Sequence, residues 1–281
     1  MRGSIATRLP VRELVAGQWH FEARSPALDG ASHVAVIAQW SRSAVMSRSM
    51  RELVGQLQAH GYQVVVSSAC EALGPLDWGH AVDLDRLTVI RKPNVGYDFG
   101  SWSLALDAIQ DLSGRSRVIL ANDSMVGPFI SMGPLLEQLE ATPADVWALT
   151  DSYQFGYHLQ SYFLGFTNGA LAERPLHRFW SGIRHEPDKA AIIGRYELGF
   201  SRLIRDEGFV HVPAFAHELV VAPGSNPVIK GWRELLGRGF PFVKREILRD
   251  PSVAPGGSAV RAVVKRMLAV DVDEWAEAGP A

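Results

Sequence analysis

The chain has 281 residues, of which 47% are hydrophobic and 21% charged, an ordinary composition for a globular protein with a sizeable core. Its 28 Lys and Arg nearly balance 30 Asp and Glu, for a net charge of -2, so the composition does not suggest a polyanionic partner, nucleic acid included. The single cysteine, Cys70, excludes an internal disulfide and any metal site built from several cysteines.

The first half of the chain alternates between strand-like and helix-like patterns. Residues 33–40 form a short apolar run typical of a buried strand, residues 43–61 have apolar positions at helical spacing, and residues 62–69 predict the next strand. This order indicates a right-handed β-α-β crossover. The alternation continues with strands predicted at 87–94, 116–123 and 144–152 and helices at 96–112 and 132–142. We therefore expect an α/β fold with a mostly parallel central sheet and helices on both faces.

The last third of the chain is less regular. Residues 158–166 alternate like one half-buried strand, and residues 194–209 predict an amphipathic helix. Residues 226–252 indicate a helix, a Gly-Phe-Pro turn and a short basic helix. Residues 258–275 are amphipathic and partly basic, which fits docking on the domain, pairing with a partner or lying on a membrane surface, with docking as the default.

No linker, repeat or low-complexity tract divides the chain. We therefore expect one domain over residues 31–252, an N-terminal extension (1–30) and a C-terminal amphipathic helix or tail (253–281), with the helix over residues 258–275. The N-terminus lacks the apolar run of a signal peptide, and no stretch is long enough to span a bilayer. We expect a cytoplasmic protein, with peripheral association at the inner face of the plasma membrane as a further option.

Polar clusters follow three of the predicted strands. Ligands of α/β sheets bind beyond the carboxyl ends of the strands, so these clusters are expected to line one crevice. The first cluster, NVGYDFG, contains Asn94, Gly96 and Asp98, the second is Asn122-Asp123-Ser124, and the third begins at Asp151.

Each cluster also has a purely structural interpretation. Asp123 could ligate a hard divalent cation, with Asn122 and Ser124 completing the shell or holding a ribose, or the three residues could form an Asx-turn. Gly96 permits a positive φ or a close backbone approach, and Asp98 could instead cap the following helix. The glycine spacing matches neither a P-loop nor a Rossmann fingerprint.

Further candidates come from the last third of the chain. His158 and Gln160 share one face of the predicted strand and could bind a hydroxyl-rich ligand, although a histidine there is more often structural. Glu197 lies on a mostly apolar helix, where it either faces solvent or is buried, and a buried Glu would have a raised pKa and could act as a base. His217, followed by Glu218, could place an imidazole near a metal or form a surface ion pair.

The chain carries no Gly-x-Ser-x-Gly, His-Glu-x-x-His or P-loop lysine, so serine hydrolase, zinc protease and NTPase functions lack support. Seven other segments occur in a fixed order: RKPNVGYDFGSW, ANDSMVGPF, VWALTDS, HLQSYFLGF, FW, YELGFSRLIRDEGF and NPVIKGWRELLGRGFPFVKREILRD. Together they resemble the rhamnan synthesis protein F family of bacterial polysaccharide glycosyltransferases, over most of residues 33–251.

The resemblance implies a single GT-A-like (Rossmann-like, nucleotide-sugar-binding) domain. It also implies a glycosyltransferase that moves a sugar, rhamnose or a related deoxyhexose, from a dTDP- or UDP-sugar to a cell-surface polysaccharide or lipid-linked acceptor. In such folds an Asp-x-Asp motif at a strand end holds a divalent cation, Mg²⁺ or Mn²⁺, and the diphosphate of the sugar donor. Candidate donor-binding residues are Asn94, Gly96, Asp98, Asn122, Asp123, Ser124, His158, Gln160, Lys244 and Arg245, and candidate metal ligands are Asp123 and His217.

The match to the family's pattern is incomplete at two places. Asn122-Asp123-Ser124 offers one carboxylate where the motif has two, so metal binding should be weak, and Lys244 and Arg245 would then help to neutralise the leaving group. Tyr97 stands where Arg is common in the family.

The resemblance also implies inversion at the transferred sugar, because the common rhamnosyl donor has a β-L linkage and the usual product is α. An inverting transferase needs a base for the acceptor hydroxyl, and the candidates are Asp151 and Glu197, with Asp151 favoured by its strand end. The main alternative is a non-catalytic module of a glycan assembly complex, motivated by Asn122 and Tyr97. A sugar-nucleotide hydrolase or phosphotransferase is a weaker one.

Overall fold

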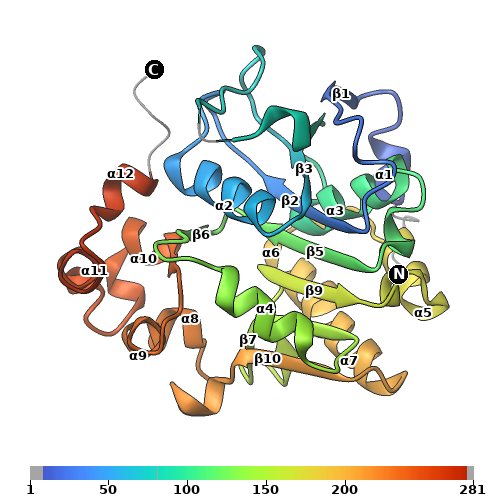
Figure 1. Cartoon of the computed structure of the whole chain (residues 1–281). Helices are drawn as coiled ribbons and strands as arrows, with labels where there is room; N and C mark the ends of the chain where they lie inside the picture. Colours follow the sequence, from blue (N-terminus) through green and yellow to red (C-terminus); the bar gives the residue numbers. More distant parts are fainter. Residues whose placement is uncertain (1–8, 81, 277–281) are drawn as a thin grey trace, which may run out of the picture.

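A central sheet organises the part of the chain that the computed structural model describes, residues 9–80 and 82–276 (Figure 1). Its strand order is β1-β4-β3-β2-β5-β9-β7-β10, and β8 pairs with β7 beside this path. The strands are β1 (His20–Ala23), β2 (His33–Gln39), β3 (Gln63–Ser68), β4 (Leu87–Arg91), β5 (Arg117–Asn122), β7 (Val146–Ser152), β8 (His158–Leu159), β9 (Phe163–Thr167) and β10 (His211–Phe215). A separate antiparallel pair joins β6 (Met125–Val126) to β11 (Val243–Lys244).

The sheet is mostly parallel, as the sequence predicts. β2, β3, β4, β5, β7 and β10 run in one direction, whereas β1, β8 and β9 run in the other. The apolar side chains of β2 and β5 are buried on both faces of the sheet, which explains why their sequences are continuous apolar runs rather than alternating ones.

Helices cover both faces of the sheet, as Figure 1 shows. The buried side chains of each set join a separate apolar core. One set is α2 (Arg48–Ala59), α4 (Gly133–Ala141), α8 (Pro227–Lys230), α9 (Trp232–Gly237), α10 (Arg245–Arg249), α11 (Val260–Leu268) and α12 (Val272–Ala276). The other is α1 (Val11–Leu14), α3 (Tyr97–Ala108), α5 (Arg174–Ser181), α6 (Lys189–Ile192) and α7 (Leu198–Asp206).

Several element boundaries differ from the predicted ones for local reasons. Helix α2 begins at Arg48, because the Ser47 hydroxyl accepts the N–H of Met50 and caps it there. The predicted strand 158–166 is wrong as a single element, since residues 160–162 leave it in a turn between β8 and β9. The predicted helix 258–275 is broken at Ala269, which has a φ of 56° and ends α11.

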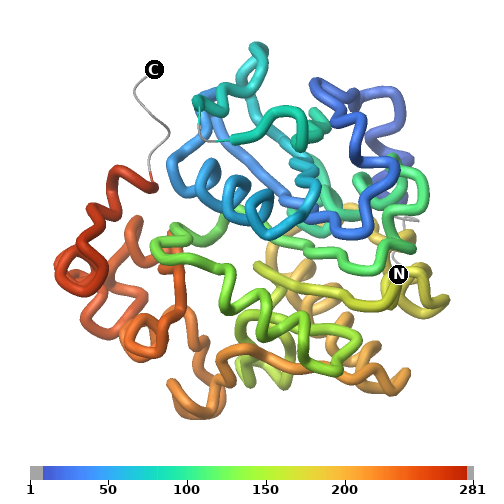
Figure 2. Tube along the Cα trace, viewed as in Figure 1, coloured from blue at the N-terminus to red at the C-terminus, as the bar shows by residue number. Residues whose placement is uncertain are grey.

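Both ends of the described chain pack onto the sheet. At one edge β1, from the expected N-terminal extension, pairs antiparallel with β4. The C-terminal helices contribute Val264 and Trp275 to the core. Figure 2 shows α12 lying beside α2. The Arg48 guanidinium of α2 lies 4.6 Å from the centroid of the Trp275 ring of α12. The expected docking of the C-terminal segment is therefore confirmed. No helix among the described residues is long and apolar enough to cross a membrane.

Candidate functional site

A cleft of about 850 Å³ opens at the carboxyl ends of β2 and β5. Residues 39–43, from the last residue of β2 onward, form one wall, and Asp123 and Ser124 follow β5. Strand β2 has β3 on one side and β5 on the other, so the strand order reverses between β2 and β5. The crevice outside the strands at such a reversal is the usual ligand site of an open α/β sheet.

Cations outnumber carboxylates among the side chains that line this cleft. An excess of Lys and Arg around a concave surface favours an anionic ligand, and the planar guanidinium groups suit phosphate oxygens in particular. The cations are Arg42, Lys189, Lys244, Arg245 and Arg249, and the carboxylates are Asp123, Glu246 and Asp250.

The tripeptide Asn122-Asp123-Ser124 forms a tight turn at the floor of the cleft. Asn122 Oδ1 accepts hydrogen bonds from the Ser124 backbone N–H at 3.1 Å and from its hydroxyl at 2.6 Å, so the Asx-turn interpretation is correct. Asp123 Oδ2 accepts the N–H of Trp40 at 2.9 Å, across from β2. The turn thus holds the Asp123 carboxylate at the cleft, and the structural and functional interpretations of these residues are compatible.

Two basic residues from the far end of the sequence are fixed beside this turn. Lys244 Nζ donates to the Ser124 hydroxyl at 3.0 Å, and Arg245 Nε donates to the Asp123 carbonyl at 3.1 Å. Arg245 also donates from Nη1 to the carbonyl of Ala276 at 2.8 Å, so the C-terminal segment helps to complete the cleft. Burial lowers the pKa of Lys244, while the charges of Glu197 and Asp98 act in the opposite direction.

Asp98 lies behind the turn rather than at a helix cap. Its Oδ2 accepts the side-chain N–H of Asn122 at 2.7 Å. Burial, and then the neighbouring charge of Asp123, raise the pKa of Asp98 to about 7, although Lys244 acts to lower it. Burial also raises the pKa of Asp123.

The capping position of α3 belongs to Gly96, with a φ of 86°. A Cβ atom on Gly96 would lie 2.6 Å from Cγ2 of Val11, so this glycine makes room for α1. Asn94 is exposed and is not among the residues that line the cleft. Tyr97 is also exposed and has a φ of 53°.

Asp151 and His217 form a second buried group at the end of β7. Asp151 Oδ1 accepts the backbone N–H of His217 at 2.7 Å and lies 3.1 Å from its ring Nδ1. Glu218, the next residue, is exposed. His217 therefore pairs with Asp151, and neither the expected pairing with Glu218 nor a contact with Asp123 occurs.

The remaining candidates brace the turn between β8 and β9. Glu197 Oε1 accepts both the backbone N–H and the hydroxyl of Ser161 at 2.9 Å. Gln160 is hydrogen-bonded to Thr150 and Asn226, and the His158 ring pairs through Nδ1 with the carbonyl of Gly156. None of His158, Gln160 and Glu197 lines the 850 Å³ cleft.

The residues around Asp123 suit a divalent cation only when the phosphate oxygens of a ligand also coordinate the metal. Among the described residues no three His, Cys, Asp or Glu side chains are grouped so as to hold a metal ion. Asp123 already uses Oδ2 for the Trp40 N–H. Mg²⁺ commonly binds one or two carboxylates together with substrate phosphates and water, and this arrangement suits the single carboxylate present.

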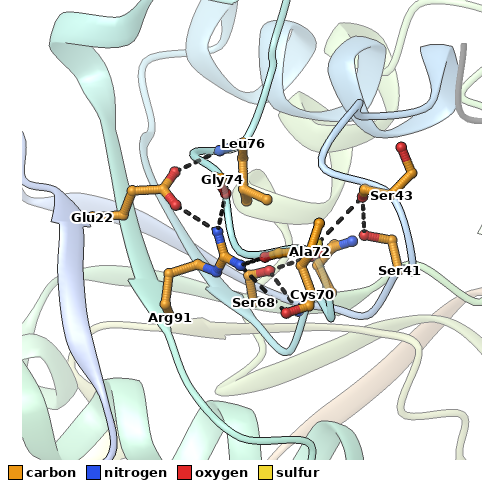
Figure 3. A network of polar contacts seen from close by, with 10 residues as sticks. Glu22, Ser41, Ser43, Ser68, Cys70, Ala72, Gly74, Leu76 and Arg91 are labelled. Atoms are coloured by element: carbon orange, nitrogen blue, oxygen red, sulfur yellow. Dashed lines mark hydrogen bonds and ion pairs between the residues drawn. The ribbon is translucent and has the colours of Figure 1, made fainter. Parts of the chain in front are cut away.

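The residues of the cleft wall, 39–43, are not among the candidates that the sequence suggests. The polar residues Ser41, Arg42 and Ser43 follow the first predicted strand, as polar residues follow the other strands, and this was the available signal. A hydrogen-bond network supports this wall from behind (Figure 3). Arg91 binds Glu22 at 2.6 Å and the carbonyl of Cys70 at 3.3 Å, and the Cys70 thiol donates to the carbonyl of Ser43. The loop after β3 is thereby tied to the loop that lines the cleft.

The sheet and cleft define an α/β protein with a cationic cleft at the carboxyl edge of its strands. Residues 81–273 match the rhamnan synthesis protein F family, and the chain belongs to that family. It is 30% identical over 193 residues to virulence protein VirA of Vibrio anguillarum, a match that covers 57% of this chain and 62% of VirA. It is 23% identical over 153 residues to the uncharacterized protein y4gN of Sinorhizobium fredii, covering 53% of this chain and 40% of y4gN. The chain thus spans less than two thirds of the length of these relatives.

Proposed function

We propose that the protein is a glycosyltransferase of polysaccharide synthesis. It would move a sugar, rhamnose or a related deoxyhexose, from a dTDP- or UDP-sugar to a cell-surface polysaccharide or glycolipid acceptor, with inversion. The observation that carries the proposal is the position of the cationic cleft, at the reversal of strand order between β2 and β5. Membership of a family named for rhamnan synthesis supports the same substrate class.

A GT-A-like, nucleotide-sugar-binding fold is the architecture that this proposal needs. Its support is the run of parallel strands β4-β3-β2-β5, with helices on both faces and a cleft at the carboxyl edge. The exposed indole of Trp40 offers a surface for the nucleoside, and Lys244 and Arg245, which also line the cleft, offer one for the diphosphate.

The charges of the cleft suit the chemistry of sugar transfer. The sugar becomes oxocarbenium-like while the bond to the diphosphate breaks, so negative charge grows on the leaving phosphate. Lys244 and Arg245 are held in place by Ser124 and Asp123 and are available to stabilise that charge without reorganisation. A base at the same edge of the sheet would accept the acceptor's proton, and Asp151 and Glu197 lie there.

A divalent cation is proposed as a partner of the sugar donor rather than as a resident of the free protein. Asp123 would hold it together with the phosphate oxygens, and it would supply further neutralisation of the leaving diphosphate. With one carboxylate available, we expect weak Mg²⁺ or Mn²⁺ binding in the absence of the sugar donor.

The test is a calorimetric titration of the purified chain with dTDP-rhamnose, UDP-glucose, GDP-mannose and the free nucleotides. Each titration is made with and without Mn²⁺ or Mg²⁺. We expect a dTDP- or UDP-sugar to bind with at least ~10-fold preference over the GDP-sugar, which corresponds to about 1.4 kcal/mol. ³¹P NMR of the same samples would show release of the nucleoside diphosphate. Absence of binding by every nucleotide sugar would overturn the proposal, and binding without any consumption would favour the non-catalytic module.

A further inference from the structure

The buried Asp151–His217 pair at the end of β7 is not explained by a structural role alone. The Asp151 carboxylate can only accept hydrogen bonds, so the neighbouring Nδ1 of His217 carries the ring proton. In the neutral imidazole this leaves a lone pair on Nε2, the opposite corner of the ring. An orienting carboxylate behind an imidazole is the arrangement by which a histidine is prepared to accept a proton.

Nε2 of His217 is the unused end of this pair. No other residue in the described part of the chain forms a hydrogen bond with it, and it is not among the polar atoms that are sealed from solvent without a partner. The charged and titratable neighbours of the ring are Asp151, Tyr153, whose ring centroid is 4.9 Å away, and Glu218. The ring is thus buried on the Asp151 side and free to meet a ligand at Nε2.

The strand register places Asp151 level with Asp123, although neither Asp151 nor His217 is among the residues that line the cleft. Asn122 donates its backbone N–H to the Tyr162 carbonyl, and the Tyr162 hydroxyl is 2.7 Å from that of Thr150. These three residues form a row across β5, the start of β9 and β7, and Asp123 and Asp151 each lie one residue further toward the carboxyl edge. Two strand spacings, about 10 Å, therefore separate Asp123 from Asp151.

Exposed aromatic and apolar side chains occur on the loop after β7 and directly after His217, and the Tyr153 ring contacts the His217 ring. Tyr153 and Phe155 lie on the loop after β7 with 48% and 74% of their surface exposed, and Leu219 follows His217 by two residues and is 54% exposed. The Tyr153 and Tyr157 rings are 5.4 Å apart. Such a surface, apolar with hydroxyl groups at its edge, suits the face of an acceptor sugar.

Resting on the transferase function proposed above, we propose that His217 is the catalytic base and that Asp151 is its positioning residue. The acceptor hydroxyl gives its proton to Nε2 of His217 as its oxygen bonds to the anomeric carbon. The bond from that carbon to the diphosphate oxygen breaks, and its electron pair leaves with the phosphate beside Lys244 and Arg245. Asp151 stays ionised and stabilises the imidazolium that forms.

The other carboxylate candidate is less well placed for this role. Glu197 Oε1 is occupied by the two hydrogen bonds from Ser161, and its charge acts on Lys244 on the donor side. Asp151 itself is 4% exposed and directs its bonded oxygen at His217. Both carboxylates thus already accept hydrogen bonds, whereas Nε2 of His217 accepts none from the described residues.

The experiment compares two nucleophiles with His217→Ala, using dTDP-rhamnose as the sugar donor. Methanol must lose a proton to react, whereas azide is already an anion and needs no base. We expect His217→Ala to lower methanol transfer at least ~100-fold, the usual worth of a general base, while glycosyl azide forms at the wild-type rate. Asp151→Asn should likewise lower methanol transfer and leave azide transfer unchanged. The dTDP-rhamnose affinity of both variants, measured by calorimetry, should stay within a factor of two of the wild-type affinity.

The matched control is His211→Ala, which removes another histidine from the same region, whose Nδ1 pairs with the carbonyl of Phe209. It should leave transfer to both nucleophiles unchanged. Equal loss of methanol and azide transfer in His217→Ala, or unchanged methanol transfer, would overturn the assignment. Because sugar-donor affinity is measured separately, these results are distinct from failure of the proposed function, in which no nucleotide sugar binds.

Discussion

Lys244 and Ser124 are joined by a hydrogen bond of 3.0 Å, although 120 positions separate them in the sequence. The short β6–β11 ladder, which pairs Lys244 with Met125, brings the two together. The bond holds an ammonium group over the cleft at the point where β5 ends. It also connects the family motif ANDSMVGPF to the basic segment near the end of the matched region.

Lys244→Gln should weaken binding of the nucleotide-sugar donor by about 10-fold or more, because a charge-assisted contact to phosphate is lost, about 1.4 kcal/mol. Calorimetric titration with dTDP and dTDP-rhamnose measures the change. Lys265→Gln is the control, since Lys265 lies on α11 with its side chain 72% exposed and outside the cleft. Equal donor affinities of the two variants would show that Lys244 does not contact the diphosphate.

Asp98→Asn should change how stability depends on pH. The pKa of Asp98 in the folded chain, about 7, lies above its ordinary value of 3.8, so between these values the folded state keeps a proton that the unfolded state has released. The contribution of this group therefore becomes less favourable as pH rises from about 4 to 7, and is constant above that. The amide side chain of the variant has a similar shape, does not titrate, and is free of this effect.

The measurement is urea unfolding at pH 5 and pH 8 in the presence of chelator. The wild type should lose more stability between the two values than Asp98→Asn, so that the variant gains relative to the wild type at pH 8. Asp107→Asn, on the exposed side of α3, provides the control. Parallel pH profiles for wild type and Asp98→Asn would show that Asp98 is ionised normally.

The sequence predicted much of the sheet because its strands are buried on both faces. The apolar runs 33–40, 62–69, 116–123 and 144–152 correspond to β2, β3, β5 and β7. Of the three polar clusters expected to line one crevice, only the second contributes residues to the cleft, Asp123 and Ser124. The turn that ends β8 was not predictable in this way. It is stabilised by Thr150, whose carbonyl accepts the N–H of Gln160, and by Glu197, which lies 36 positions from Ser161.

Local sequence patterns also could not predict which candidate side chains contact each other. His217 suggested a metal or a surface pair with Glu218, whereas its partner Asp151 lies 66 positions away. The parallel pairing of β10 with β7 creates that contact, because Phe215 is aligned with Thr150 and the next two residues bring His217 to Asp151. The contact between His217 and Asp151 follows from the strand order, which local sequence patterns do not predict.

Arg91→Ala should destabilise the loops behind the cleft wall (Figure 3). Arg91 and Glu22 are mostly buried, with side chains 12% and 17% exposed, and Arg91 also binds the carbonyls of Cys70 and Gly74. Removing it leaves a partly buried carboxylate and unpaired carbonyls, for which we expect a loss of about 2–4 kcal/mol in the free energy of unfolding.

Urea unfolding measures this loss, and Arg24→Ala is the control. The Arg24–Asp29 pair is as short as 2.7 Å but is 43% and 60% exposed, so its removal should cost less than about 1 kcal/mol. We further expect Arg91→Ala to weaken sugar-donor binding, because Arg91 no longer anchors the loop after β3, whose Cys70 thiol binds the Ser43 carbonyl. Equal stability of the two variants would contradict the bracing role.

Gly165→Ala tests the spacing of β5 and β7, which β9 sets. Gly165 is aligned with Trp147 on β7, and an added Cβ would lie 2.0 Å from Cε2 of the indole ring. The ring is buried, so it cannot move aside without disturbing the core, and we expect a loss of about 3 kcal/mol or more in stability.

Gly199→Ala in α7, where no atom lies within 4 Å of the added Cβ, should instead stabilise the chain by about 0.5–1 kcal/mol. Thermal and urea unfolding decide between these outcomes, and recovery of stability in the double variant Gly165→Ala, Trp147→Leu would identify the ring as the obstacle. A neutral Gly165→Ala would mean that β9 can shift, and the alignment of Asp123 with Asp151 would then be adjustable rather than fixed.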